Sequence, residues 1–142
     1  MNASPGDLPL FAEGIVGFGR PPRAAPYLIG GYCPRCDRWY FPRTQHCRHC
    51  HEESREAPLG SRGTVYSCTV VRAKPPLGFP RPYALAYVDL RDRPLRIFML
   101  VDPAAADDVR IGQEVELAIG AVGVNRSGAP CLRPFFRPLD SH

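Results

Sequence analysis

Apolar residues in the second half of the chain recur in short runs that are separated by Gly, Pro and polar clusters. Such runs, rich in β-branched and aromatic residues, are typical of β-strands. The runs cover residues 64–71, 83–90, 95–101, 114–121 and 131–137. The pattern therefore predicts five strands.

The segments between these runs predict their connections. Residues 74–82 form a proline-dense loop, and residues 91–94 form a tight turn that makes the second and third strands a hairpin. Asp102 followed by Pro103 is the start signal of a short helix, and residues 125–128 form a turn. Five strands with a small helix between the third and the fourth predict an OB-fold barrel.

The first part of the chain has a weaker pattern. Its apolar residues are Leu8, Leu10, Phe11, Ile15, Val16 and Phe18. They are compatible with a short amphipathic helix, which Gly14 and Gly17 weaken, and a proline-rich stretch follows at residues 20–26. We interpret residues 1–26 as an arm and linker. The arm is either a docking element for another subunit or a strap across its own domain.

Two Cys-x-x-Cys pairs dominate the middle of the chain. The four cysteines are Cys33, Cys36, Cys47 and Cys50. Each pair forms a knuckle that directs two sulfurs at one centre, so the spacing predicts a four-thiolate structural zinc site. We expect a zinc ribbon over residues 27–58 and the barrel over residues 59–142.

Neighbouring residues fit such knuckles. Pro34 fixes one backbone angle, and Asp37 and His51 occupy the positions after each pair, where a positive φ is common. Four arginines near the loop are expected to offset the charge of the thiolates: Arg35, Arg38, Arg43 and Arg48. We expect the aromatic runs 27–29 and 39–41 to pack over the metal hairpin, and residues 52–58 to be a polar exit.

Three alternatives to structural zinc remain open. The pairs could form disulfides, although the chain opens without an apolar signal-peptide core, and iron could occupy a rubredoxin-like redox site. One of three histidines could also replace a cysteine as ligand: His46, His49 or His51.

Composition limits the class of protein. A chain of 142 residues can hold one core, or a metal-stapled module with one compact domain. With 44% apolar and 23% charged residues and no apolar run of about 20 residues, we expect a soluble, cytoplasmic protein. The net charge of +4 is modest.

An ordered set of short motifs resembles one known family. The motifs are Cys33 with Cys36, the run 40–43 before Cys47 and Cys50, and residues 63–67, 87–90, 111–116 and 135–138. Over roughly residues 30–138, the chain resembles the DUF35 family, proteins that join a rubredoxin-like zinc ribbon to an OB-fold. The N-terminal arm departs from the family pattern.

This resemblance implies a non-catalytic accessory subunit of an enzyme complex that acts on CoA thioesters. The implied partner is a thiolase that acts on a β-keto acyl-CoA, or alternatively an enoyl-CoA hydratase-like enzyme. We assign no catalytic residue, because the chain lacks a Gly-x-Ser-x-Gly elbow and a phosphate loop, and because Cys68 and Cys131 lie within apolar strands. The candidates for contact with coenzyme A are Arg43, Arg72, Lys74 and Arg81.

A second function comes from a different class. OB-folds and zinc ribbons also bind single-stranded nucleic acid. The slight positive charge argues against it, and so do the predicted strands 64–71 and 83–90, whose only aromatics are Tyr66, Tyr83 and Tyr87 and which have no interleaved basic residues. Nucleic acid is therefore the weaker hypothesis, and electron transfer through iron is the third.

Overall fold

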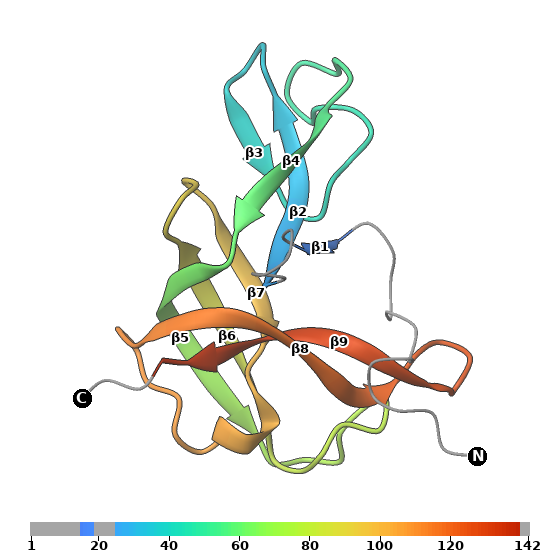
Figure 1. Ribbon diagram of the computed structural model, residues 1–142, viewed down its shortest axis with the longest axis vertical. Helices are drawn as coiled ribbons and strands as arrows, with labels where there is room; N and C mark the ends of the chain where they lie inside the picture. The colour runs from blue at the N-terminus through green and yellow to red at the C-terminus, as the bar shows by residue number, and fades with distance from the viewer. Residues whose placement is uncertain (1–14, 19–24, 140–142) are drawn as a thin grey trace.

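The computed structural model describes residues 15–18 and 25–139, which form two packed β-sheets. A ribbon stands on a curled barrel sheet (Figure 1). The ribbon strands are β1 (Val16–Phe18), β2 (Pro26–Cys33), β3 (Arg38–Tyr40) and β4 (Arg55–Gly60). The barrel strands are β5 (Arg62–Val71), β6 (Tyr83–Leu90), β7 (Arg96–Leu100), β8 (Glu114–Val124) and β9 (Pro130–Pro138).

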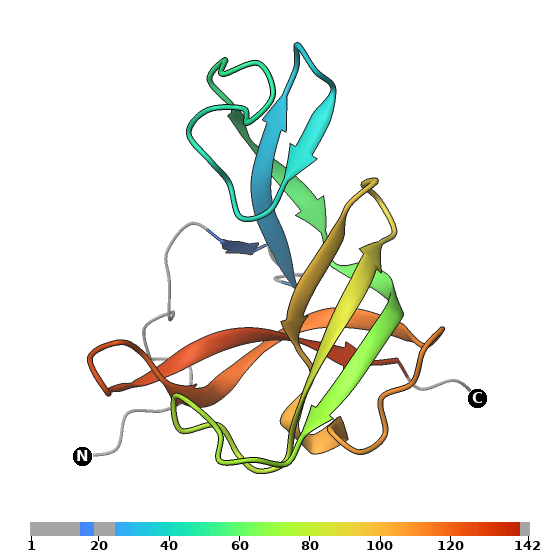
Figure 2. The same cartoon turned by 180° about the vertical axis from the view of Figure 1, so that it is seen from behind.

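The barrel sheet has the strand order β7-β6-β5-β8-β9, with antiparallel pairing throughout. The long β5 pairs with both β6 and β8, and a parallel bridge between Val101 and Phe136 brings the end of β7 to β9. Seen from behind, β5, β6 and β7 lie side by side (Figure 2). The prediction of a mainly β chain with a five-stranded OB-fold barrel is confirmed.

The predicted short helix is a single 3-10 turn over Pro103–Ala105. The Asp102 side chain caps it by accepting a hydrogen bond of 2.9 Å from the backbone N–H of Ala104. No α-helix occurs within residues 15–18 and 25–139. Accordingly, this part of the chain contains no helix with the length and apolar character needed to cross a membrane.

The ribbon has β2 at its centre, with β3 and β4 as antiparallel neighbours. The sequence interpretation missed β4, since it treated residues 52–58 as a polar exit. The strand buries Ala57 and Leu59 on one face, but the charged Arg55 and Glu56 and the following Pro58 obscure that alternation. Residue 58, the predicted domain boundary, lies inside β4, and the division at that point stays a prediction.

The N-terminal arm contributes β1, which also pairs with β2. The suggested helix is wrong for Val16–Phe18, which are extended, with Val16 buried. Gly17 explains the difference, because the Tyr27 ring lies so close to its backbone that a Cβ would fall within 2.5 Å of it. These residues act as a strap on their own ribbon. Residues 1–14 and 19–24, with the rest of the predicted arm and linker, lie outside the described part.

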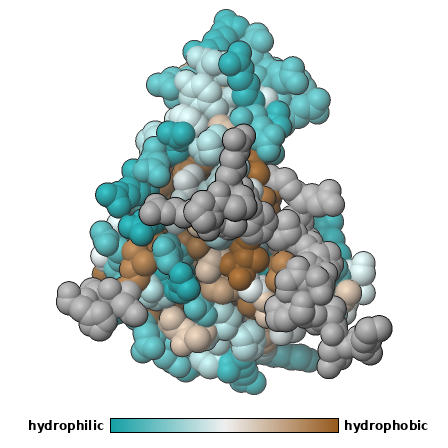
Figure 3. Space-filling view, in the orientation of Figure 1, coloured by the Kyte–Doolittle hydropathy of each residue, from teal (hydrophilic) through white to brown (hydrophobic). Residues whose placement is uncertain are grey.

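One hydrophobic core joins the ribbon to the barrel. Leu28 of β2 and Leu59 of β4 are fully buried in the same cluster as Val65, Val115 and Phe136 of the barrel. Hydrophilic residues cover the ribbon end of the molecule, whereas hydrophobic residues gather over the barrel part (Figure 3). The ribbon therefore depends on the barrel core at its base and on the cysteine cluster at its outer end.

The aromatic residues of the ribbon divide between these two places. Trp39 and Phe41 pack against the shared core, and the Arg93 guanidinium lies 4.2 Å from the centre of the Trp39 ring. Tyr40 instead contacts the cysteine cluster. The expected packing over the metal hairpin is thus wrong for Phe41 alone, since the Trp39 ring also lies 4.4 Å from that of Tyr32, the residue before Cys33 on the paired strand.

Candidate metal centre

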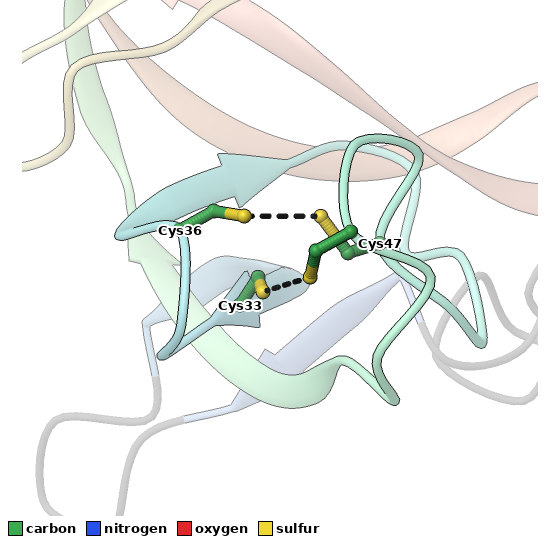
Figure 4. Close-up of side chains that lie close together, drawn as sticks. Cys33, Cys36 and Cys47 are labelled. Carbon is green, nitrogen blue, oxygen red and sulfur yellow. Dashed lines mark hydrogen bonds between the residues drawn. The ribbon is translucent and has the colours of Figure 1, made fainter.

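Four cysteines from three parts of the ribbon converge on one point. Cys33 ends β2, Cys36 lies in the turn before β3, and Cys47 and Cys50 lie in the loop between β3 and β4. Their sulfur atoms all lie within 4.8 Å of one another. Figure 4 shows the labelled side chains of Cys33, Cys36 and Cys47 pointing toward a common centre. The four cysteines are therefore placed to bind one metal ion.

The sulfur separations fit a tetrahedral ion. Zn–S bonds of about 2.3 Å place the corners of a regular tetrahedron about 3.8 Å apart. The Sγ atoms of Cys33 and Cys50 are 3.5 Å apart, and those of Cys36 and Cys47 are 3.9 Å apart. Both separations are far longer than a disulfide bond of about 2.05 Å. All six cysteines are free, which removes the disulfide alternative for the described residues.

The backbone of both knuckles has the predicted form. Asp37 has φ 52° and His51 has φ 64°, as expected for the positions after each pair. The His51 N–H donates to the Cys47 carbonyl at 2.9 Å, and the His49 N–H points at the Cys47 sulfur at 3.4 Å. Cys47 thus sits in a turn that directs a backbone donor at its sulfur.

Tyr40 makes Cys47 different from the other three cysteines. The Tyr40 hydroxyl lies 2.9 Å from the Cys47 sulfur. Cys47 is almost completely buried, with 1% of its surface exposed. Chiefly through this hydrogen bond, the pKa of the Cys47 thiol is lowered to about 5 and that of Tyr40 is raised to about 12. Hydrogen bonding to Cys50 and burial raise the pKa of Cys36 to about 12. The hydrogen bond from Tyr40 therefore favours the thiolate form of Cys47.

Charged and histidine side chains lie around the cluster rather than in it. Arg35 forms an exposed ion pair of 3.1 Å with Glu52, and Arg43 donates to the Ser54 carbonyl at 2.9 Å. The three histidines of this region are exposed: His46, His49 and His51. Among the described residues, the group with metal-ligand geometry contains only cysteines, so the histidine-ligand alternative is not supported.

The four candidates for coenzyme A contact fall into two places. Arg72, Lys74 and Arg81 are exposed on the loop between β5 and β6, where the Arg81 Nε donates to the Arg72 carbonyl at 2.6 Å. Arg43 belongs to the ribbon, which lies at the opposite end of the molecule from that loop (Figure 1). The structure therefore gathers three of the four and separates the fourth.

A hollow of about 850 Å³ lies beside the 3-10 turn. Arg72 reaches its rim by an ion pair of 2.8 Å with Asp107. Its charged lining residues are Asp102, Asp107, Asp108, Glu116, Arg110 and Arg137. Because carboxylates outnumber guanidinium groups, this hollow is unsuited to the phosphates of a nucleotide.

Packing in the barrel determines the roles of Arg133 and of the two cysteines outside the cluster, Cys68 and Cys131. Arg133 is buried in β9, donates to the carbonyls of Val122 and Val124 at 2.8 and 3.2 Å, and lies over the Phe79 ring. The sequence pattern of residues 131–137 did not predict that Arg133 would connect the 74–82 loop to the β8–β9 hairpin. Cys131 is buried and Cys68 packs against the core, which matches their predicted role as small apolar residues.

Comparisons with known proteins cover both halves of the chain. The family model described as the rubredoxin-like zinc ribbon domain of ChsH2 matches residues 21–54, and the one described as its C-terminal OB-fold domain matches residues 56–120. The benzoylsuccinyl-CoA thiolase subunit BbsA of Thauera aromatica is 37% identical over 119 residues, which is 81% of this chain and 78% of that protein. BbsA of Geobacter metallireducens is 35% identical over 115 residues, with 80% and 76% covered.

A solved structure agrees with these matches. The chain is similar to a chain of the Ltp2-ChsH2(DUF35) aldolase, with a TM-score of 0.61 and 26% sequence identity. The similarity covers 79% of this chain and 84% of that chain. Ribbon and barrel therefore match together and in the same arrangement.

Proposed function

Because this chain belongs to the DUF35 family, in which a rubredoxin-like zinc ribbon precedes an OB-fold domain, we propose that it is the accessory subunit of a complex that acts on CoA thioesters. One observation carries the proposal: the relatives that match about four-fifths of the chain are subunits of a thiolase. The catalytic partner is a thiolase-like enzyme that cleaves or forms a β-keto acyl-CoA. The cytoplasmic location expected from the sequence stays a prediction.

The cysteine cluster supports a structural part in this complex. Cys33, Cys36, Cys47 and Cys50 would hold a zinc ion through four thiolates. A closed tetrahedral site stabilises the fold and offers no position for water or a substrate carbonyl. The zinc site would thus hold the ribbon rigid, and the catalytic partner would carry out the chemistry.

The basic loop supports a contact with the CoA part of the substrate. Arg72, Lys74 and Arg81 lie on one exposed loop. Because Arg72 is paired with Asp107, Lys74 and Arg81 are the cations that would bind phosphate by charge-assisted hydrogen bonds. Arg43 lies in the other half of the molecule, so we assign the phosphate contact to the loop alone.

We expect the purified chain to have no turnover with acyl-CoA, and its catalytic partner to need it for turnover. The physical reason is that the described residues offer a closed metal site and two cysteines held in the barrel, neither of which can attack a thioester. The experiment expresses the chain with each neighbouring gene, identifies the protein that it retains, and measures thiolysis by the single proteins and the complex.

The variant Cys68→Ala tests whether this cysteine takes part in the reaction of the assembled complex. Cys68→Ala should leave the rate of the assembled complex within a few-fold of wild type, because Cys68 packs against the core. Turnover by the single chain that adding a partner does not change would contradict the proposal. Retention of a hydratase-like enzyme would keep the accessory role but change the partner.

A further inference from the structure

Three large aromatic side chains are exposed together on the outer side of the barrel. Tyr66 of β5, Tyr87 of β6 and Phe98 of β7 are 51%, 46% and 50% exposed. Tyr87 and Phe98 are direct cross-strand partners, with ring centres 4.7 Å apart. The Arg96 guanidinium lies 3.3 Å from the centre of the Tyr66 ring. We call Tyr66, Tyr87, Phe98, Arg96 and Asp89 the aromatic face.

The barrel itself cannot bury these rings. Along β6 and β7 the inward residues Ala86, Val88 and Ile97 fill the core, so the alternate residues must point outward. Among the described residues, five large hydrophobic side chains are exposed, and three of them lie on this face. The other two, Leu77 and Ile111, lie in loops. Such a concentration marks an interaction surface.

The charges on the aromatic face are already balanced. Arg96 donates to both carboxylate oxygens of Asp89, at 2.6 and 3.2 Å, and this pairing holds the pKa of the Asp89 carboxyl below its usual range. Arg62, at the far end of β5, lies 3.9 Å from Glu116. A nucleic-acid strand needs unpaired cations for its phosphates, whereas a neutral protein surface does not. The charge balance favours a protein.

We propose that the aromatic face is the surface on which the catalytic subunit docks, through an uncharged, apolar patch of its own. This inference rests on the proposed function and adds the site of contact. Tyrosine and arginine are the residues that most often dominate the binding energy of protein interfaces. The face presents two tyrosines, a phenylalanine, and an arginine held in place by Asp89.

The test uses the full chain and the catalytic subunit that it retains. Tyr87→Glu and Phe98→Glu place a carboxylate at the centre of the face, and each should weaken the complex about thirtyfold or more, the loss typical of a hot spot. Ser127→Glu is the matched control, because it adds the same carboxylate at an exposed position in the turn between β8 and β9, and neither of these strands carries a residue of the face. Its affinity for the partner should equal that of wild type. Circular dichroism establishes that all three variants are folded.

The possible results separate the docking surface from the accessory role and from nucleic-acid binding. If the wild-type chain retains a catalytic subunit and Tyr87→Glu and Phe98→Glu retain it equally well, the docking surface is wrong and the accessory role stands. If the wild-type chain retains no catalytic subunit, both proposals fall. If the wild-type chain instead binds single-stranded DNA at physiological salt and Tyr87→Glu abolishes that binding, the face is a stacking platform for bases.

A second and independent inference concerns Tyr40. A metal-bound Cys47 is a thiolate and has no proton to give, so in the hydrogen bond of 2.9 Å the Tyr40 hydroxyl must be the donor. We propose that Tyr40 is a positioning residue that holds the Cys47 sulfur in the metal site and slows the release of the ion. Hydrogen bonds from outside the ligand set commonly change metal affinity by about 10–100-fold.

Tyr40→Phe should raise the rate of zinc transfer to a chromophoric chelator about tenfold. Tyr32→Phe is the matched control: it removes a hydroxyl from the same ribbon, but that hydroxyl donates to Asp37 at 2.7 Å and touches no sulfur. In the cobalt-loaded protein, the thiolate-to-metal charge-transfer band should shift for Tyr40→Phe alone. Equal release rates for Tyr40→Phe and wild type, or an equal increase in both variants, would overturn the proposal.

Discussion

Removal of the zinc ion, or Cys47→Ser, is expected to unfold the ribbon and to destabilise the whole chain. Apparent binding free energies of structural zinc in small modules are about 10–16 kcal/mol, which exceeds or equals the stability of most domains. Outside its base, the ribbon has little apolar surface to replace that energy. Cys47→Ser also leaves a hydroxyl in a site where the cysteine is 1% exposed.

The measurement combines elemental analysis with thermal unfolding. The wild-type chain should contain about one zinc ion per chain, and its unfolding temperature should fall sharply when a chelator is added. Cys68→Ser is the control, because Cys68 lies outside the cluster. A chain that contains iron, or that stays folded without metal, would reject structural zinc.

The sequence predicted the parts of this molecule that local chemistry decides. Each knuckle is set by a few adjacent residues, so the cysteine cluster and the positive φ of Asp37 and His51 could be foreseen. The barrel strands were visible because each is a short run rich in apolar, β-branched and aromatic residues between Gly, Pro and polar clusters. Asp102 predicted the position of the 3-10 turn but not its length.

The missed features depend on partners that are distant in the chain. β4 has a weak pattern of its own and forms because β2 offers it an edge, with Ile29 opposite Pro58. The hydrogen bond between Tyr40 and Cys47 and the burial of Arg133 arise where strands and loops meet. Local spacing contains no information about such contacts.

The aromatic face shows an intermediate case. Tyr66 and Tyr87 were considered as strand aromatics, whereas Phe98 was placed in the predicted strand 95–101 but not beside Tyr87, a position that follows from the β6–β7 register. The same register places Asp89 opposite Arg96, and that pair makes the face neutral. The functional interpretation therefore changes with a pairing that the sequence analysis did not draw from the hairpin it predicted around residues 91–94.

Leu59→Ala is expected to lower the free energy of unfolding by about 2–5 kcal/mol, a large part of the roughly 5–15 kcal/mol typical of a domain. Leu59 is fully buried in the core shared by ribbon and barrel, so its loss opens a cavity between them. Leu77→Ala, at an exposed loop position, is the matched control and should change the stability little.

Two probes test whether this core makes ribbon and barrel one cooperative unit. Trp39 is the only tryptophan of the chain and packs against the core shared by ribbon and barrel, so its fluorescence reports that contact, while far-UV circular dichroism reports mainly the barrel strands. In denaturant, both transitions should coincide in the wild-type chain and shift together in Leu59→Ala. In Leu59→Ala, the fluorescence transition could instead move while the circular dichroism transition stays in place. This result would show that the barrel keeps its stability without the ribbon, because Leu59 would then stabilise only the contact between ribbon and barrel.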